Sequence, residues 1–465
     1  MAKEKLTYER KLVWDVFSDT EKNAAFDFAS GYRRFISEIK TEKEAVTWAK
    51  KEAEKKGFSE LNESRKSKKV YLAIRSSALA LAIRGKRPIR DGVRIIISHV
   101  DAPRLDLKPQ PLIEEEGLSF LKTHYYGGIK KYQWVTKPLS LHGIVVLKSG
   151  VKKEIVIGEK ENEPVLTVTD LLPHLAKDQM EKKMSDAVDG ESLNLLIASL
   201  PVPKEKDKKT PPVKNRVKEA VLKLLYQTYG IAEEDLISAE LAAVPAGPAR
   251  ELGLDRSLIL GYGQDDRICT YASFQAFLKA DEPEYTSICL LIDKEEIGSE
   301  GTSSIQSGFL SFFLCQLAGI TETELARALA KSYALSADVN AGLDPSYREV
   351  TESQNTPRLG YGTVITKYTG HGGKFLSSEA SAEYMAYLRR LFEKHKVLWQ
   401  TGELGKIDKG GGGTVAKYLA RQNIETIDIG PALLSMHSPY EVSHKGDLYC
   451  TYRVPNRTYS YISIS

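Results

Sequence analysis

The chain has 465 residues, of which 42% are hydrophobic and 28% charged, a composition typical of a globular protein of about two domains. Its 66 Lys and Arg residues nearly balance 62 Asp and Glu, and the net charge of +4 gives no overall argument for nucleic acid or an anionic membrane as a partner. The four Cys residues show no Cys-x-x-Cys spacing, which favours reduced thiols and a cytoplasmic protein. The charged N-terminal residues and the shortness of the most apolar run, 309–320, predict neither a signal segment nor a membrane span.

The N-terminal part of the chain predicts helices followed by strands. Residues 1–60 are charged and carry large apolar side chains at helical spacing, which predicts amphipathic helices. Alternating runs at 70–75 and 78–84 precede an apolar strand that ends in His99 and Asp101. An imidazole that binds a metal needs its other ring N–H held by an acceptor, and a carboxylate two residues further along an extended chain can lie on the same side. A single His-x-Asp is weak evidence, however, because strands often end in polar residues.

The middle of the chain differs in texture from both ends. It contains short β-like segments, turn glycines, a helical pattern at 216–229 and a Lys-rich run at 204–209. We interpret the Lys-rich run as a solvated loop, since no aromatic residues interleave with it as they do in nucleic-acid sites. We therefore expect an inserted β-rich domain at 106–248 between two parts, 1–105 and 249–465, of one α/β domain.

Alternation of strands and helices returns in the last part. Asp265 stands just before the helical pattern of 268–278, where it serves either as a helix N-cap or as a carboxylate that bridges two cations. The apolar run 288–292 predicts a buried strand that ends in the adjacent carboxylates Glu295 and Glu296. Because side chains alternate at a strand end, one carboxylate could bind a metal while the other faces a different part of the pocket. The alternative is a solvated pair of strand-end charges.

Three further features follow towards the C-terminus. The run 332–338 predicts a strand that ends in Asp338. The four glycines at 410–413 are expected to hold no regular structure and to let the backbone approach a ligand closely. The last strand, 425–430, is followed by His437, and a single histidine in such a place is more often structural.

The candidate polar residues gain weight as a set. Each stands at or near the end of a strand-like run or the start of a helix: His99, Asp265, Glu295, Glu296, Asp338 and His437. In a largely parallel sheet the carboxyl ends of the strands share one edge, and functional sites are built there. Two histidines, three ligating carboxylates and one spare carboxylate are typical of a hydrolytic site with two metal ions, for which Zn²⁺ is the leading candidate.

Six short motifs stand in order along nearly the whole chain: His-Val-Asp-Ala-Pro (99–103), Tyr-Gly-Gly (126–128), Pro-His-Leu-Ala (173–176), Asp-Asp-Arg (265–267), Asp-Lys-Glu-Glu-Ile-Gly-Ser (293–299) and Met-His-Ser-Pro-Tyr-Glu (436–441). Together they resemble the aspartyl aminopeptidases, metallopeptidase family eighteen, in a bacterial-type member. The resemblance implies an α/β fold: a phosphorylase/hydrolase-like zinc aminopeptidase core with a mostly parallel central sheet flanked by helices, and an inserted β-rich dimerisation domain.

The resemblance also implies a ligand for each metal. His99 and Asp338 would bind one ion, Glu296 and His437 would bind the other, and Asp265 would bridge the two. Each subunit would therefore hold two divalent ions, with zinc expected first and cobalt or manganese as alternatives.

The remaining roles also follow from the resemblance. Asp101 would orient the metal-binding imidazole, and Glu295 would be the general base that takes a proton from the attacking water and returns it to the leaving amine. His174 would reach the active site of a neighbouring subunit, in a homo-oligomer built from dimers, as in the family's dodecamers. Cleavage of N-terminal Asp or Glu from a peptide needs a cation in the specificity pocket, and Lys367 and Lys374 lie where the family places one.

Other functions remain open on the sequence alone. The same two-metal plan serves aminopeptidases of neutral or broad specificity, and it serves related amidohydrolases or deacylases, whose substrates need no free amino terminus. A different class is an idle assembly scaffold that keeps the fold. The complete ligand set and Glu295 argue against the scaffold, because paired carboxylates are costly in a protein that does not use them.

Overall fold

The computed structural model describes residues 6–63, 66–204 and 214–458, so the Lys-rich run lies outside them except for its first residue. The chain forms two compact units, which are described separately. The first unit comprises residues 1–101, 249–436 and 441–465, and the second comprises residues 102–248 and 437–440. The segment that contains His437 therefore groups with the second unit.

Three helices open the first unit: α1 (Val13–Val16), α2 (Asp19–Glu38) and α3 (Glu42–Lys55). Both long helices begin with a capping box, Ser18 with Glu21 in α2 and Thr41 with Glu44 in α3, so their first backbone N–H groups are satisfied locally. Their apolar faces are buried in the core. The amphipathic helices predicted for residues 1–60 are confirmed.

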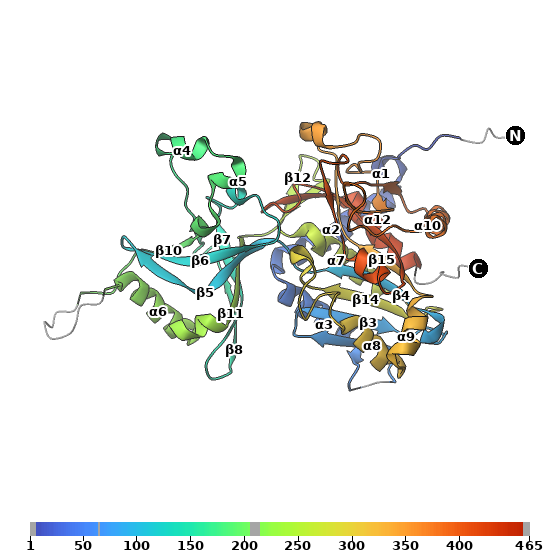
Figure 1. Ribbon diagram of the computed structural model, residues 1–465, viewed down its shortest axis with the longest axis horizontal. Coiled ribbons are helices and arrows are strands. Elements are labelled where there is room, and N and C mark those ends of the chain that lie inside the picture. The colour runs from blue at the N-terminus through green and yellow to red at the C-terminus, as the bar shows by residue number, and fades with distance from the viewer. Residues whose placement is uncertain (1–5, 64–65, 205–213, 459–465) are drawn as a thin grey trace. The chain divides into compact units, whose positions relative to one another are not determined.

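Among the described residues, the main sheet of this unit has nine strands in the order β1-β2-β3-β14-β4-β15-β21-β17-β19 (Figure 1). The strands are β1 (Ser59–Glu60), β2 (Lys69–Ile74), β3 (Ala78–Ile83), β4 (Arg94–His99), β14 (Ser287–Ile292), β15 (Tyr333–Ala337), β17 (Thr363–Thr366), β19 (Trp399–Thr401) and β21 (Glu425–Gly430). The four central strands β14, β4, β15 and β21 are mutually parallel, whereas β3 and β17 pair with them antiparallel. The sheet is thus mixed, with a parallel centre.

Helices cover both faces of the main sheet. One face packs against α2, α3, α7 (Gln264–Phe277), α10 (Ala382–Lys394) and α12 (Lys445–Thr458). The other face packs against α8 (Phe309–Ala318), α9 (Glu322–Leu329) and α11 (Ala416–Ala420). The central strands are buried on both sides, which explains why they appear in the sequence as nearly continuous apolar runs.

A smaller sheet of the same unit has the order β12-β13-β23-β22-β16. Its strands are β12 (Arg250–Leu252), β13 (Leu258–Gly261), β16 (Asn340–Ala341), β22 (Ala432–Leu434) and β23 (Glu441–His444). Short 3-10 turns of this unit are η1 (Ile89–Asp91), η6 (Glu295–Ile297) and η7 (Pro345–Val350).

The four-glycine segment is more regular than predicted. Gly411–Gly412 forms the short strand β20, which pairs antiparallel with β18 (Gly370–His371). Gly411 has a φ of +137°, and a Cβ on it would lie 2.5 Å from the carbonyl oxygen of Gly370. The lack of a side chain at Gly411 therefore allows the backbones of β18 and β20 to pair closely. The prediction that this segment has no regular structure was wrong.

The second unit contains a seven-stranded sheet of the order β8-β7-β11-β5-β6-β10-β9, with every pairing antiparallel among the residues that the structure describes. The strands are β5 (Arg104–Glu115), β6 (Leu118–Tyr126), β7 (Leu139–Val146), β8 (Lys152–Ile157), β9 (Thr167–Val168), β10 (Leu195–Ala198) and β11 (Ala239–Pro245). The helices are α4 (Lys177–Met180), α5 (Met184–Ala187) and α6 (Arg216–Tyr229), with 3-10 turns η2 (Lys131–Gln133), η3 (Pro173–Leu175), η4 (Gly190–Ser192) and η5 (Glu233–Ser238). The predicted helix at 216–229 is confirmed.

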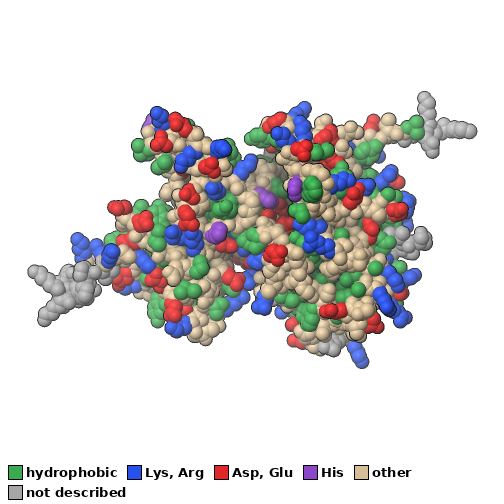
Figure 2. Space-filling model, in the orientation of Figure 1, with side chains coloured by type: hydrophobic (Ala, Val, Ile, Leu, Met, Phe, Trp, Pro, Cys, Tyr) green, Lys and Arg blue, Asp and Glu red, His purple; other side chains and the backbone are tan. Residues whose placement is uncertain are grey.

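The surface carries both signs of charge. On the face drawn in Figure 2, Lys and Arg side chains are intermingled with Asp and Glu, as the small net charge predicts. In the described part of the chain, no helix is both long enough and apolar enough to span a bilayer.

Candidate metal centre

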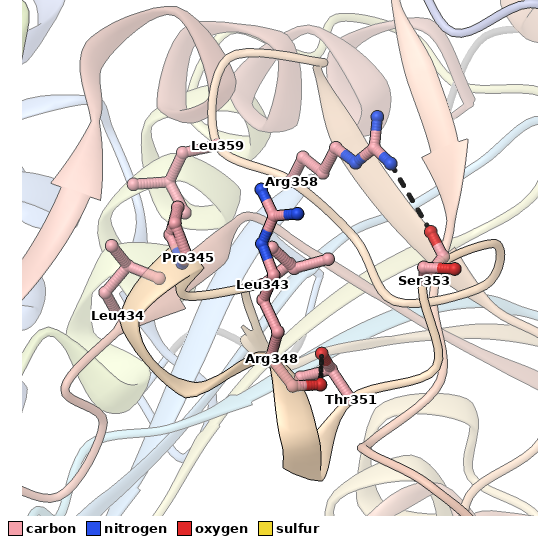
Figure 3. Close-up of a pocket in the computed structure, with 8 residues that line it drawn as sticks. All are labelled: Leu343, Pro345, Arg348, Thr351, Ser353, Arg358, Leu359 and Leu434. Carbon is pink, nitrogen blue, oxygen red and sulfur yellow. Dashed lines mark hydrogen bonds between the residues drawn. The ribbon is translucent and has the colours of Figure 1, made fainter.

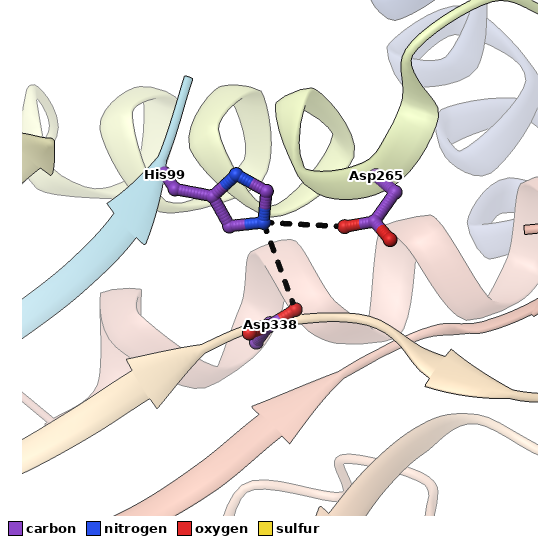
Figure 4. A group of neighbouring side chains, drawn as sticks. All are labelled: His99, Asp265 and Asp338. Carbon is purple, nitrogen blue, oxygen red and sulfur yellow. Dashed lines mark ion pairs between the residues drawn. The ribbon is translucent and has the colours of Figure 1, made fainter. Parts of the chain in front are cut away.

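Three of the predicted ligands meet at one edge of the main sheet (Figure 4). His99 is the last residue of β4, Asp338 directly follows the neighbouring parallel strand β15, and Asp265 lies in the first turn of α7. The Nε2 atom of His99 lies 3.2 Å from Asp265 Oδ1 and 4.0 Å from Asp338 Oδ1. Parallel strands thus bring together side chains that are far apart in the sequence.

The tautomer of His99 is fixed by its other nitrogen. Nδ1 lies 3.0 Å from the backbone oxygen of Asp101 and 3.4 Å from its Oδ1. A carbonyl oxygen only accepts hydrogen bonds, so Nδ1 carries a hydrogen. Without a cation, Nε2 is also protonated and bonds to Asp265; with a cation among the carboxylates, the imidazole would be neutral and Nε2 would present its lone pair. This is the orientation that a metal-binding histidine requires.

Negative charge exceeds positive charge in this buried group. Burial works to lower the pKa of His99, but hydrogen bonding to Asp101 and Asp265 outweighs it and holds that pKa well above the usual 6.5. Burial raises the pKa of Asp338 far above its ordinary value, and repulsion from Asp266 adds to the rise. Such a group calls for a positive charge among its oxygens.

A divalent cation meets that requirement. Zinc binds imidazole nitrogen and carboxylate oxygen at about 2.0–2.2 Å, so two ligand atoms of one ion lie within about 4.2 Å of each other. The separations of 3.2 and 4.0 Å from His99 Nε2 satisfy this limit. His99, Asp265 and Asp338 therefore fit a metal ion in both donor type and spacing.

Asp101 connects this group to the two glutamates. Its side chain is fully buried, Oδ1 accepts the backbone N–H of Glu295 and Oδ2 accepts that of Glu296, each at 3.2 Å. The same carboxylate lies beside Nδ1 of His99. Asp101 thus holds the imidazole through its backbone oxygen, with its carboxylate alongside, and holds the glutamate turn through that carboxylate.

The sequence predicted that the two glutamates end a strand, but they do not. Strand β14 ends at Ile292, Lys294 has a left-handed φ of +74°, and Glu295 and Glu296 lie in the 3-10 turn η6. Successive residues of a 3-10 helix are about 120° apart, so the two side chains still diverge, although not by strand alternation. The charge of Glu295 reaches both His99 and Asp338, whose pKa values it raises after the larger effects above.

Glu441 was assigned no role from the sequence pattern. It is 1% exposed, and its Oε2 accepts the backbone N–H of Gln264 at 2.5 Å and that of Asp265 at 3.1 Å. Helix α7 begins at Gln264, but the backbone at Asp265 and Asp266 is not helical, so Asp265 lies in an irregular first turn. An acidic residue within the buried strand β23 was the available signal, since a buried carboxylate needs donors.

Two predicted residues belong to the second unit. His437 Nδ1 lies 2.9 Å from the backbone oxygen of Gly128, so Nδ1 donates and Nε2 again holds the lone pair. His174 is exposed in η3. The metal-binding role of His437 and the role of His174 in a neighbouring site stay predictions.

The two lysines predicted to bind an acidic substrate both face an acid of the same loop. Nζ of Lys374 lies 3.2 Å and Nζ of Lys367 lies 3.6 Å from the carboxylate of Glu379. Lys374 also lies over the ring of Tyr368, 4.0 Å from its centroid. Hydrogen bonding and attraction to Lys374 lower the pKa of Glu379. Both lysines therefore already form ion pairs with Glu379 of the same chain.

The chain is similar to known proteins over most of its length. Residues 35–459 match the family model described as "Aminopeptidase I zinc metalloprotease (M18)". The chain is similar to the probable M18 family aminopeptidase 1 of Borrelia garinii, with 47% identity over 451 residues that cover 94% of this chain and 97% of the relative.

Solved structures are similar over almost the whole chain. A crystal structure of an M18 family aminopeptidase from Thermotoga maritima matches with a TM-score of 0.92 and 41% identity, covering 98% of this chain and 100% of the other. The S. cerevisiae mApe1 dodecamer shares the fold, with a TM-score of 0.73 and 23% identity over 93% of this chain and 96% of the other. The chain is a member of the M18 family of zinc aminopeptidases, which are peptide hydrolases.

Proposed function

We propose that this aminopeptidase works with two divalent metal ions, zinc first among the candidates. His99 and Asp338 would bind one ion, Glu296 and His437 would bind the other, and Asp265 would be the ligand shared by both. The observation that carries the proposal is the buried group of His99, Asp265 and Asp338, whose lone pair and carboxylates converge at metal-binding distances.

When bound, such ions polarise the scissile carbonyl and make water a stronger acid. Glu295 accepts the proton of the attacking water and passes it to the leaving amine. The Asp101 carboxylate accepts the backbone N–H of Glu295 and so keeps Glu295 in place. The backbone oxygen of Asp101 keeps His99 in the correct tautomer. Glu441 accepts the backbone N–H of Asp265 and so helps to hold Asp265 in place.

The substrate is a peptide with a free amino terminus, and we propose N-terminal Asp or Glu as the preferred residue, read by Lys367 or Lys374. The Glu379 carboxylate between these lysines supports a second candidate, an aminopeptidase of neutral or broad specificity. An acidic substrate has to compete with Glu379 for both cations, which weakens any preference that they confer.

We further propose a homo-oligomer built from dimers, with the second unit as the dimerisation domain and His174 entering a neighbour's active site. The support is an exposed apolar segment around that residue, in which Leu171, Leu172 and Leu175 are 54%, 50% and 70% exposed. Contiguous exposed apolar side chains mark association surfaces. The similar S. cerevisiae protein forms a dodecamer, and we propose the same assembly here.

The test is hydrolysis of Asp, Glu, Leu, Ala and Lys aminoacyl chromogenic substrates by the protein as purified, after chelation, and after restoration of Zn²⁺, Mn²⁺ or Co²⁺. We expect chelation to abolish activity and metal to restore it. The Glu295→Gln variant should keep its metal content and lose turnover, whereas Glu322→Gln, on the exposed start of α9, should match the wild type. Full activity of a metal-free sample would refute the mechanism.

Specificity is tested with a single variant. If Lys367 or Lys374 reads an acidic side chain, Glu379→Gln should raise kcat/KM for Asp and Glu substrates a few-fold relative to Leu, because an exposed ion pair is worth only about 0.2–1 kcal/mol. An unchanged ratio, together with a preference for Leu or Ala in the wild type, would select the neutral-residue candidate.

A further inference from the structure

A cavity of about 480 Å³ lies in the first unit, beside the smaller sheet, and no predicted site residue lines it (Figure 3). Its volume is within the range of small-molecule sites, roughly 300–1,000 Å³. The lining includes four apolar residues, Leu343, Pro345, Leu359 and Leu434, and two arginines, Arg348 and Arg358. It therefore joins an apolar wall to two positive charges.

The two arginines hold different positions. The guanidinium of Arg348 projects among the apolar lining residues in Figure 3, while that of Arg358 extends towards Ser353 and donates to its backbone oxygen at 3.4 Å. Within the described ranges, neither arginine forms an ion pair with a carboxylate. Most of their N–H donors therefore remain available to a ligand.

A third arginine adds positive charge from the N-terminal segment. Arg10 donates to the backbone oxygens of Thr356 and Gln354, on the loop that carries Arg358. Burial lowers the pKa of Arg10, and repulsion from Arg358 lowers it further. Positive charges of the N-terminal segment and of this loop therefore lie near one another, an arrangement that an anion stabilises.

Two of the three acidic residues at 343–359, Asp344 and Glu352, have other partners. Asp344 accepts the backbone N–H of Ser346 at 2.9 Å. Glu352 accepts the backbone N–H groups of Gln354 and Asn355 at 2.8 and 2.7 Å, which lowers its pKa. These carboxylates brace the turns of the loop, although Glu352 also attracts Arg10.

We propose that this cavity binds the carboxylate of a small organic acid or peptide, with Arg348 and Arg358 as its ligands. A guanidinium matches the two oxygens of a carboxylate in a bidentate pair, and the leucines would receive the apolar part beside it. The inference rests on the family's aminopeptidase activity and is independent of which N-terminal residue is removed.

The short stretch of chain between Asp338 and the cavity suits a peptide substrate as the source of that carboxylate. Leu343 follows Asp338 by five residues, and five residues of extended chain span at most about 18 Å. A peptide of about four to six extended residues covers the same span. The other source is a free small carboxylate that acts on the enzyme as an effector.

The experiment compares peptides of three to six residues that differ only in a C-terminal carboxylate or amide. The enzymes are the metal-loaded wild type, Arg348→Gln, Arg358→Gln and a matched control, Arg327→Gln on the exposed face of α9. We expect each pocket variant to raise KM about tenfold for one or more free-acid peptides, with kcat unchanged, because a charge-assisted hydrogen bond is lost. Amide peptides and the Arg327→Gln control should show no change.

A calorimetric titration with succinate separates the two sources and needs no catalysis. One outcome is that succinate binds the wild type and not Arg348→Gln while the peptide kinetics stay unchanged. This result would support the site and assign it to a free carboxylate. If the pocket variants alter neither the peptide kinetics nor the succinate binding, the proposal is overturned. If the wild-type enzyme cleaved none of the peptides, the mechanism proposed above would be refuted. The titration would still show whether the cavity binds a carboxylate.

Discussion

The first unit contains two buried histidine–aspartate pairs with opposite electrostatic character. His99 Nδ1 lies 3.4 Å from Asp101 Oδ1, and His444 Nδ1 lies 3.6 Å from Asp447 Oδ1. The pKa of His99 is well above 6.5, whereas burial lowers the pKa of His444 to about 4. Burial also raises the pKa of Asp447 to about 8. Near pH 7 the second pair is therefore uncharged.

The surroundings explain the contrast. Beyond its partner, His99 faces the carboxylates of Asp265 and Asp338. His444 instead packs against Trp14, with ring centroids 5.0 Å apart, and the carboxyl of Asp447 accepts the N–H groups of Gly360 and Gly362 at 2.7 Å each. A buried His–Asp contact does not by itself predict a metal site; an excess of carboxylates around it favours one.

The largest expected effect comes from removing an imidazole. His99→Ala should lose bound metal and lower kcat/KM by more than about 100-fold, because a ligand is worth more than the outer-shell contacts that typically cost 10–100-fold. His444→Gln should keep its metal content, measured by atomic emission. Equal metal loss in both variants would contradict the assignment of a metal-binding role to His99 and not to His444.

The aspartates should differ next. Asp101→Asn keeps the size of the side chain but replaces one acceptor oxygen with a donor, so it cannot accept both glutamate N–H groups and hold His99. We expect kcat to fall roughly 10–100-fold. Asp447→Asn should leave kcat within about twofold of the wild type, since Asp447 contacts the segment at Gly360 and Gly362 and not the metal centre. Steady-state kinetics with restored metal measure both.

The smallest effect is a change in the pH dependence of stability. Asp447 has a raised pKa in the folded protein, so its contribution is present at low pH and is lost as pH rises through about 8. His444 has a lowered pKa, so its contribution is present above pH 6.5 and is lost as pH falls through about 4. Between pH 6.5 and 8.5, Tm of the wild type should fall a few degrees more than that of Asp447→Asn. Parallel Tm profiles would contradict the assignment of a neutral pair.

Sequence reasoning reached the parts of the fold that short-range patterns determine. Apolar runs located β4, β14 and β21, and the polar residues at the ends of β4 and β15 led to His99 and Asp338. Glu441 was missed because its partner Asp265 lies 176 residues away in the sequence. The internal pairing of Lys374 with Glu379 also depends on the path of a loop that has no periodicity to read.

The Asp101 carboxylate also sets limits on how this enzyme can change. Its oxygens accept the backbone N–H groups of Glu295 and Glu296 and lie beside the imidazole of His99, so a substitution that removes them disturbs both neighbours, while the backbone oxygen of Asp101 still accepts from Nδ1 of His99. Directed evolution for new substrates should therefore accumulate changes in the peripheral loops, at 343–359 and 367–379, and leave this residue untouched. On the roles proposed above for these loops, the reaction and the choice of peptide would be adjusted by separate parts of one chain.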